Sequence, residues 1–413
     1  MVGLQAGNGF GGAARRFYSR HHILVLSLTL SLVGVATGTA SAAALLQNAA
    51  AREPLLFAAG ALVAAGCCAV QTRHLALSLL TAVAPLPGLI WAAPLSGGSS
   101  FAFVPFVAYA FGFAIAAVDA QAIVIRALDR TATEQPWRAA AAAVGLAVVL
   151  AWMWFGGPPF GDAALQLAVD IALAALSVRI LLPAAASLLA FDEDFVARAN
   201  RLRERRQRLA ETMALATTPR WALSFLGIAL VFAALGGSGA EPVLHAARSA
   251  EIVRTAVSLA LLAVAAGWAT SGWREAVAAT FATAVVCLMA LWAGAVVAHA
   301  PLAFVCVSAP AALTVFFALH GGRCAATYRR QGEEGSVARQ RAMEETAVAQ
   351  VFAGAGAVAA LLPALIFHRA DAVFAVAMLL AAFGGILFAP AIAGAVETLL
   401  PRRRSVEQLY GKR

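Results

Sequence analysis

The chain has 413 residues, of which 62% are hydrophobic and only 12% are charged, and its mean hydropathy is +0.82. Soluble domains carry about 25% charged residues, so this composition excludes an ordinary soluble protein, which could not hide so much apolar surface. The formal charge of +9 would also suit nucleic-acid binding, but the sequence has no soluble basic domain, and we expect no nucleic-acid partner.

Apolar segments follow one another along the whole chain, each long enough to approach the roughly 20 residues that a helix needs to cross the hydrocarbon core. We therefore predict an all-α polytopic membrane protein with about 12 transmembrane helices. The expected spans are residues 23–46, 54–70, 75–95, 101–125, 139–157, 163–190, 221–236, 252–270, 276–298, 302–320, 346–367 and 372–399.

Basic residues indicate which side of the membrane each gap between spans faces. Most of the 30 Lys and Arg residues lie at the termini or in the even-numbered gaps. The odd-numbered gaps contain only Arg52, Arg248, Arg254 and Arg369. Because short cytoplasmic loops carry the excess of Lys and Arg, we expect a multi-pass protein of the bacterial inner membrane with both termini in the cytoplasm. We expect these basic residues to contact the headgroups of anionic membrane lipids.

The N-terminal segment has features of a signal peptide, since Arg15, Arg16 and Arg20 precede an apolar run that reaches Ala40-Ser41-Ala42. The run continues through Leu46, and the first half of the chain needs this helix to match the second, so we expect it to be retained. The five cysteines show no zinc-like spacing, and we expect no metal, no cofactor and no disulfide.

Residues 191–220 divide the spans into two sets of six. The segment opens with three acidic residues and then turns basic, and an apolar stripe from Phe195 to Met213, which includes Leu209, follows helical spacing. We predict a cytoplasmic amphipathic basic linker helix on the membrane surface. Both halves begin on the same side, which predicts two parallel six-helix repeats about an axis along the membrane normal. The expected domains are residues 1–190, 191–220 and 221–413.

Three short stretches stand at the end of span four, in the loop after span ten and at the end of span six: Ala116-Ala117-Val118-Asp119-Ala120, Tyr328-Arg329-Arg330-Gln331-Gly332 and Leu182-Pro183-Ala184. They resemble motifs of the resistance–nodulation–division (RND) superfamily, in particular its MMPL branch, with alanine in place of the first motif's glycine. The resemblance implies a transporter of a lipid or other hydrophobic molecule that is coupled to protons. The family's large periplasmic porter domains are missing, since the gaps after spans one and seven are short.

Asp119 is the first candidate for proton coupling. A carboxylate inside a span costs about 2.5–3.5 kcal/mol on insertion scales, and such a group usually faces the bundle interior and marks an ion path. The RND resemblance implies a proton-relay acid at this place. The alternative is an acid near the cytoplasmic end of its span that reaches water or pairs with Arg126.

His320 and Asp170 are the other proton-coupling candidates. His320 ends span ten, at the place that corresponds to Asp119, and its imidazole titrates near neutral pH; the alternative is an interfacial histidine without a role. The RND resemblance would imply an acid there, which this chain lacks. Asp170 lies in span six, where we expect a water-filled vestibule. Arg179 of the same span cannot pair with Asp170 on an ideal helix, and we expect it to snorkel to the cytoplasmic surface.

The sequence contains no catalytic triad, no phosphate-binding loop and no metal cluster, so we expect no enzyme. The favoured function is an RND-like transporter that takes a lipid or other hydrophobic substrate from the bilayer. One alternative is a non-transporting scaffold subunit that binds partner proteins of an envelope-biosynthesis complex. Another is a major-facilitator-type transporter, which also has two parallel halves.

Overall fold

The computed structural model describes residues 27, 29, 31, 32, 53–92, 95, 104–128, 137–154, 160–189, 191, 193–246, 249–270, 272–293, 308–367 and 372–399. Within these ranges the regular structure is helical and contains no strand, which confirms the all-α class. The first expected span and the two termini lie almost entirely outside the described residues.

Six segments of the described chain are long and apolar enough to cross a membrane: Leu75–Ala92, Val104–Ile125, Ala163–Ala186, Trp273–Ala290, Gly335–Pro363 and Ala375–Leu399. Four shorter apolar helices coincide with other expected spans. The chain is therefore a multi-pass helical membrane protein, while the total of about 12 spans stays a prediction.

The helices that precede the expected linker are α2 (Glu53–Thr72), α3 (Leu75–Val83), α4 (Leu86–Ala92), α5 (Val104–Leu128), α6 (Trp137–Trp154) and α7 (Phe160–Ala186). Helices α3 and α4 share one expected span, which breaks at Ala84 and Pro85 because proline has no backbone N–H to continue the helix. Helix α8 (Glu193–Ala214) and the short 3₁₀ turn η1 (Leu215–Thr217) occupy the linker.

The remaining helices are α9 (Pro219–Ala246), α10 (Ser249–Thr270), α11 (Trp273–Ala293), α13 (Ser308–Arg330), α14 (Gly335–Phe367), α15 (Ala372–Phe383), the π-helical turn η4 (Gly384–Phe388) and α16 (Ala389–Leu399). Helix α14 begins well before residue 346, where the expected span begins. Its first turns carry several charged residues, which lowered the apolar signal without ending the helix.

Helices α5 and α13 form the centre of the bundle. Nearly every side chain of α5 from Val104 to Ala120 is buried, and so is every side chain of α13 from Ser308 to Leu319. The two helices contact each other, and both also contact α14. Spans four and ten are thus adjacent and central, as the sequence led us to expect.

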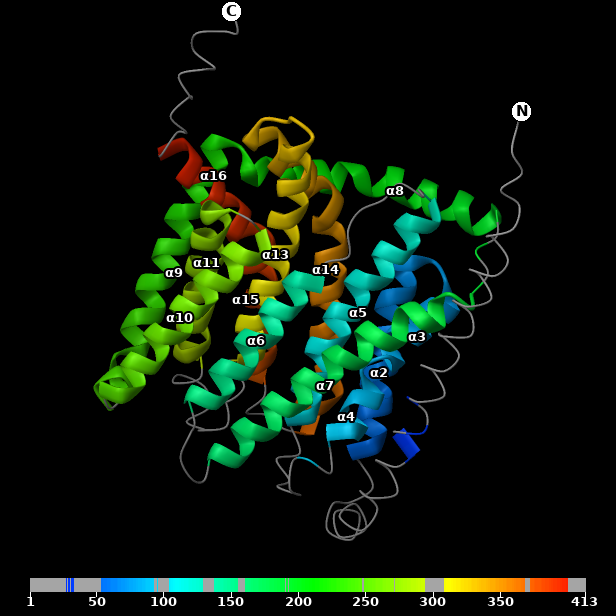
Figure 1. Ribbon diagram of the computed structural model, residues 1–413, viewed down its shortest axis with the longest axis horizontal. Coiled ribbons are helices and arrows are strands. Elements are labelled where there is room, and N and C mark those ends of the chain that lie inside the picture. The colour runs from blue at the N-terminus through cyan, green and yellow to red at the C-terminus, as the bar shows by residue number, and fades with distance from the viewer. Residues whose placement is uncertain are drawn as a thin grey trace, which may run out of the picture.

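Helix α8 lies across one end of the bundle, beside the ends of α5, α13 and α14 (Figure 1). It contacts α14 and α5, and Phe195 and Ala199 of the expected stripe are buried. Leu209 of the same stripe is 47% exposed. The buried part of the stripe therefore packs on protein.

Candidate functional site

Asp119 and Arg179 form an ion pair inside the bundle. Asp119 lies on α5 and Arg179 on α7, with 3.2 Å between Arg179 Nη1 and Asp119 Oδ1. The side chains are 8% and 19% exposed, respectively. The expectation that Arg179 snorkels away to the surface is therefore wrong, because a buried carboxylate on the neighbouring helix attracts it. The proposed alternative partner, Arg126, has its side chain outside the described residues.

The pair fits between its helices because the surrounding residues are small. Ala116, Ala117 and Ala120 beside Asp119 are all fully buried, so α5 can approach its neighbours closely. Two charges that face each other in a low-dielectric interior satisfy one another, whereas either charge alone would be strongly unfavourable there. The chemistry of the pair is therefore sensitive to the binding of one proton.

His320 of α13 belongs to the same cluster through Arg179. The positive charge of Arg179 lies close enough to act electrostatically on the imidazole. The ring stacks on Phe316 with 6.1 Å between the ring centroids, and its Nδ1 lies 3.3 Å from Gln350 Nε2 of α14. Arg179 is thus paired with Asp119 of α5 and acts electrostatically on His320 of α13.

Asp170 lies elsewhere on α7. Its side chain is 3% exposed and hydrogen-bonds Gln166 one turn earlier. Its Oδ2 has no hydrogen-bond partner among the described residues. Nine residues separate it from Arg179, which is about 13.5 Å along the helix axis. Asp170 is therefore a buried acid apart from the Asp119 cluster, and it does not line the cavities described next.

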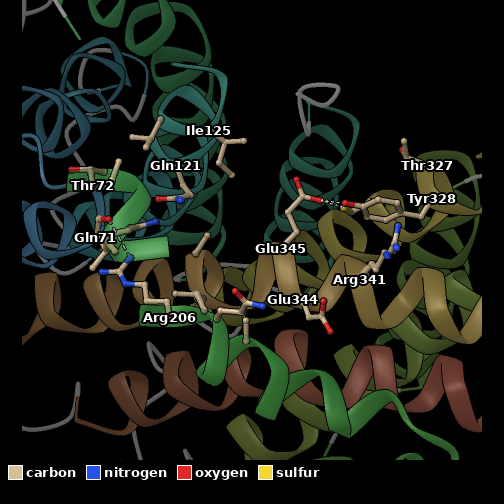
Figure 2. Close-up of a pocket in the computed structure, with 18 of the residues that line it drawn as sticks. Gln71, Thr72, Gln121, Ile125, Arg206, Thr327, Tyr328, Arg341, Glu344 and Glu345 are labelled. Carbon is tan, nitrogen blue, oxygen red and sulfur yellow. Dashed lines mark hydrogen bonds between the residues drawn. The ribbon is translucent and has the colours of Figure 1, made fainter. Parts of the chain in front are cut away.

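A cavity of about 580 Å³ lies beneath α8. We call it the outer vestibule; Figure 2 shows how residues of α2, α5, α8, α13 and α14 surround it. Its polar lining comprises Gln71, Thr72, Gln121, Arg206, Gln207, Cys324, Thr327, Tyr328, Gln331, Arg341, Glu344 and Glu345. Apolar residues, among them Val124, Leu202 and Val348, line it as well, so the cavity offers both polar and apolar surface.

A second cavity of about 50 Å³, the inner cavity, continues from the outer vestibule toward the cluster. Its lining includes His320, and also Val118 and Ala122, which flank Asp119 on α5. Gln121, Cys324 and Glu345 line both cavities. The two cavities therefore extend from the α8 end of the bundle as far as His320 and the residues that flank Asp119.

Sequence reasoning missed Glu345 of α14. Its Oε2 accepts hydrogen bonds from Tyr328 Oη at 2.8 Å and from Cys324 Sγ at 3.2 Å. Burial, with the charge of Glu345 as a further cause, raises the pKa of the Cys324 thiol and that of the Tyr328 hydroxyl. Both groups therefore hold their protons at neutral pH. The available signal was an acidic pair, Glu344-Glu345, that enters an otherwise apolar helix.

A network of ion pairs at the α8 end of the second half was also missed. Glu397 of α16 binds Arg274 of α11 at 2.9 Å and Arg339 of α14, while Glu275 of α11 binds Arg329 of α13. Each of these residues is an expected loop charge or lies near the end of a span. Their pairing joins four helices at one end, so we assign the network a structural role.

The described residues contain no group of histidines, cysteines and acids that could hold a metal ion. Comparison with protein families finds no matching family model, and no curated protein matches the chain. Among solved structures, the crystal structure of SecDF in its super-membrane-facing form has a TM-score of 0.49 and 12% sequence identity. That match covers 93% of this chain and 63% of SecDF, so the chain spans less than two thirds of its length. A likeness at this level assigns no family.

Proposed function

We propose that this protein is an RND-like, proton-coupled membrane transporter in which Asp119 binds the coupling proton. The observation that carries the proposal is a buried Asp119–Arg179 pair beside a cavity that is lined from both halves of the chain, by Val118 and Ala122 next to Asp119 and by His320. A protein that only needed a packed core would gain by replacing such a pair with apolar residues.

Protonation gives this pair two states. With Asp119 ionised, the carboxylate holds Arg179 between α5 and α7. When a proton from the inner cavity binds Asp119, the carboxyl becomes neutral and the attraction is lost, so Arg179 must find another partner or water. A ligand changes a conformational equilibrium only through such a difference in interaction between two states, and here the ligand is the proton.

The helix contacts support the two-repeat arrangement that the transporter hypothesis needs. Helix α14 contacts α2 and α5, while α6 contacts α10 and α13. When each helix of the first half is matched to the helix at the same place in the second half, α2 corresponds to α10, α5 to α13 and α6 to α14. The contacts then map onto one another, as expected for two halves that run in the same sense. Under this correspondence, Asp119 and His320 would lie on matching helices.

The substrate we propose is a lipid or another hydrophobic molecule. The chain has no large domain between its spans to collect a water-soluble substrate, so the substrate would enter from the bilayer. The outer vestibule then serves the proton, because charged and hydroxyl groups form part of its lining. The scaffold hypothesis and the major-facilitator hypothesis, whose fold is a rival with two parallel halves as well, require no titration of Asp119, and this difference separates them from the proposal.

Proton flux into liposomes tests the proposal. The purified protein is reconstituted in phosphatidylethanolamine–phosphatidylglycerol vesicles that contain a pH-sensitive dye, and a pH gradient is imposed. We expect Asp119→Asn to reduce flux to that of protein-free vesicles, Asp119→Glu to retain part of it and His320→Ala to lose part of it. Asp170→Asn is the matched control, since it removes a buried acid outside the cluster.

The result that would overturn the proposal is wild-type flux in Asp119→Asn. A wild-type protein without flux above the protein-free vesicles would also count against it. Either result would leave the scaffold hypothesis the stronger one. Equal losses in Asp170→Asn and Asp119→Asn would show that the Asp119 cluster is not the specific site.

A further inference from the structure

The outer vestibule and the inner cavity meet at a small set of residues. Those that line both are Gln121, Ile125, Cys324, Thr327, Glu345 and Ala349. Glu345 is the carboxylate among them, and the Cys324 thiol is held protonated by burial and by Glu345, which raise its pKa. A proton that moves from the vestibule to His320 therefore passes Glu345 at the junction.

The other charged groups around the path already have partners. In the outer vestibule, Arg341 is paired with Glu333, and Glu344 accepts a hydrogen bond from Gln340 Nε2 at 3.2 Å. Arg206 of α8 donates to the carbonyls of Val70 at 2.7 Å and Gln71 at 3.2 Å. Arg323 and His320 line the inner cavity. These arrangements leave Glu345 as the acid that faces both cavities.

The hydrogen bonds of Glu345 fix it in the position that a relay needs. Tyr328 and Cys324 both donate to the same oxygen, Oε2. A proton-transfer group works only when its geometry is set before the proton arrives. The inner cavity, at about 50 Å³, has room for a few water molecules that could bridge from Glu345 to His320.

We propose that Glu345 is the proton-entry residue of this path. This inference rests on the proposed function and adds the route by which Asp119 receives its proton. A hydronium ion in the outer vestibule gives a proton to the Glu345 carboxylate. The proton then moves through water in the inner cavity to His320 and on to Asp119, while Glu345 returns to its ionised form. One proton leaves the vestibule and one neutral Asp119 is formed, and the reverse sequence releases it.

Time-resolved infrared spectroscopy tests this route without knowledge of the substrate. The full-length protein in lipid nanodiscs is mixed with a photolabile proton donor, and a laser pulse lowers the pH. The carboxyl C=O band that is absent from Asp119→Asn reports protonation of Asp119. In Glu345→Gln we expect that band to rise roughly 100-fold more slowly, the lower end of what a positioned acid–base group contributes, and to reach the same final amplitude.

Two further variants separate a relay from a general effect. Glu345→Asp keeps the carboxylate and should recover much of the rate. Glu344→Gln is the matched control, since Glu344 is the neighbouring acid and lines the outer vestibule but not the inner cavity. This variant should leave the rate unchanged. Wild-type kinetics in Glu345→Gln, or equal slowing in Glu344→Gln, would overturn the role of Glu345. Absence of the Asp119 band in the wild type would instead refute the proposed function itself.

Discussion

The Asp119–Arg179 pair predicts a strong and asymmetric response to mutation. At 3.2 Å and an effective dielectric constant of about 20, the two charges attract by about 5 kcal/mol before desolvation is counted. Removing one partner of a buried pair typically costs about 3–5 kcal/mol of stability. Because Arg179 is 19% exposed and Asp119 only 8%, an orphaned Arg179 can reach water more easily than an orphaned Asp119. We therefore expect Arg179→Gln to destabilise more than Asp119→Asn at neutral pH.

A double-mutant cycle measures this coupling. The wild type, Asp119→Asn, Arg179→Gln and the double variant are unfolded by detergent titration in mixed micelles, which gives a free energy of unfolding for each. We expect a coupling energy of about 2–4 kcal/mol, and a double variant that is more stable than Arg179→Gln. Arg179→Gln should regain stability as the pH falls, because protonation removes the orphaned charge. A coupling energy below about 0.5 kcal/mol, the limit expected for independent sites, would refute the ion pair.

Two further predictions concern the contact between the halves and the vestibule wall. Gly60 of α2 packs on the backbone carbonyl of Ala360 of α14, while nothing lies near a Cβ at Gly66; we expect Gly60→Ala to lower the unfolding temperature and Gly66→Ala to leave it unchanged or raise it. In a variant whose single cysteine is Cys324, Glu345→Gln should speed alkylation at about pH 8 by roughly 10-fold for each unit by which the thiol pKa falls. Equal unfolding temperatures in the glycine pair, or an unchanged alkylation rate, would contradict these two contacts.

The sequence was sufficient to predict the helical class, most helix positions and an acid, Asp119, that faces the bundle interior. Each of these follows from local information, namely the length of an apolar run or an acid inside one. The partner of Asp119 was not predictable in this way, because Arg179 lies on a different helix and a single sequence does not tell which helices touch. Because Arg179 lies near the end of its span, the sequence favoured a side chain that snorkels to the surface. The structure reverses that conclusion, because α5 lies next to α7.

Charged residues at the start of α14 obscured a second part of the site. Arg339, Arg341 and Glu345 lower the hydropathy of residues 335–345, so the expected span began at residue 346. In the structure their charges are satisfied by residues distant in sequence: Arg339 by Glu397, and Glu345 by donors from α13. A hydropathy argument treats each charge as a cost of insertion, whereas tertiary partners remove much of that cost. Glu345 could therefore be recognised as part of the site only from the contact between α13 and α14.

Helix α14 would connect the proposed proton path to the apolar interior of the bundle. Along its length it carries Glu345 at the junction of the cavities, Gln350 at the ring of His320, and Gly356 against the ring of Phe113. Phe113 and Tyr109 of α5 are fully buried and fill the interior beyond Asp119, away from the vestibule. A side chain at Gly356 would meet the Phe113 ring, so α14 packs closely on α5 at this point. If α14 shifts when Asp119 loses its charge, the outer vestibule and the apolar packing around Phe113 and Tyr109 would change together. Alternating access requires such a coupling between the two ends of the bundle.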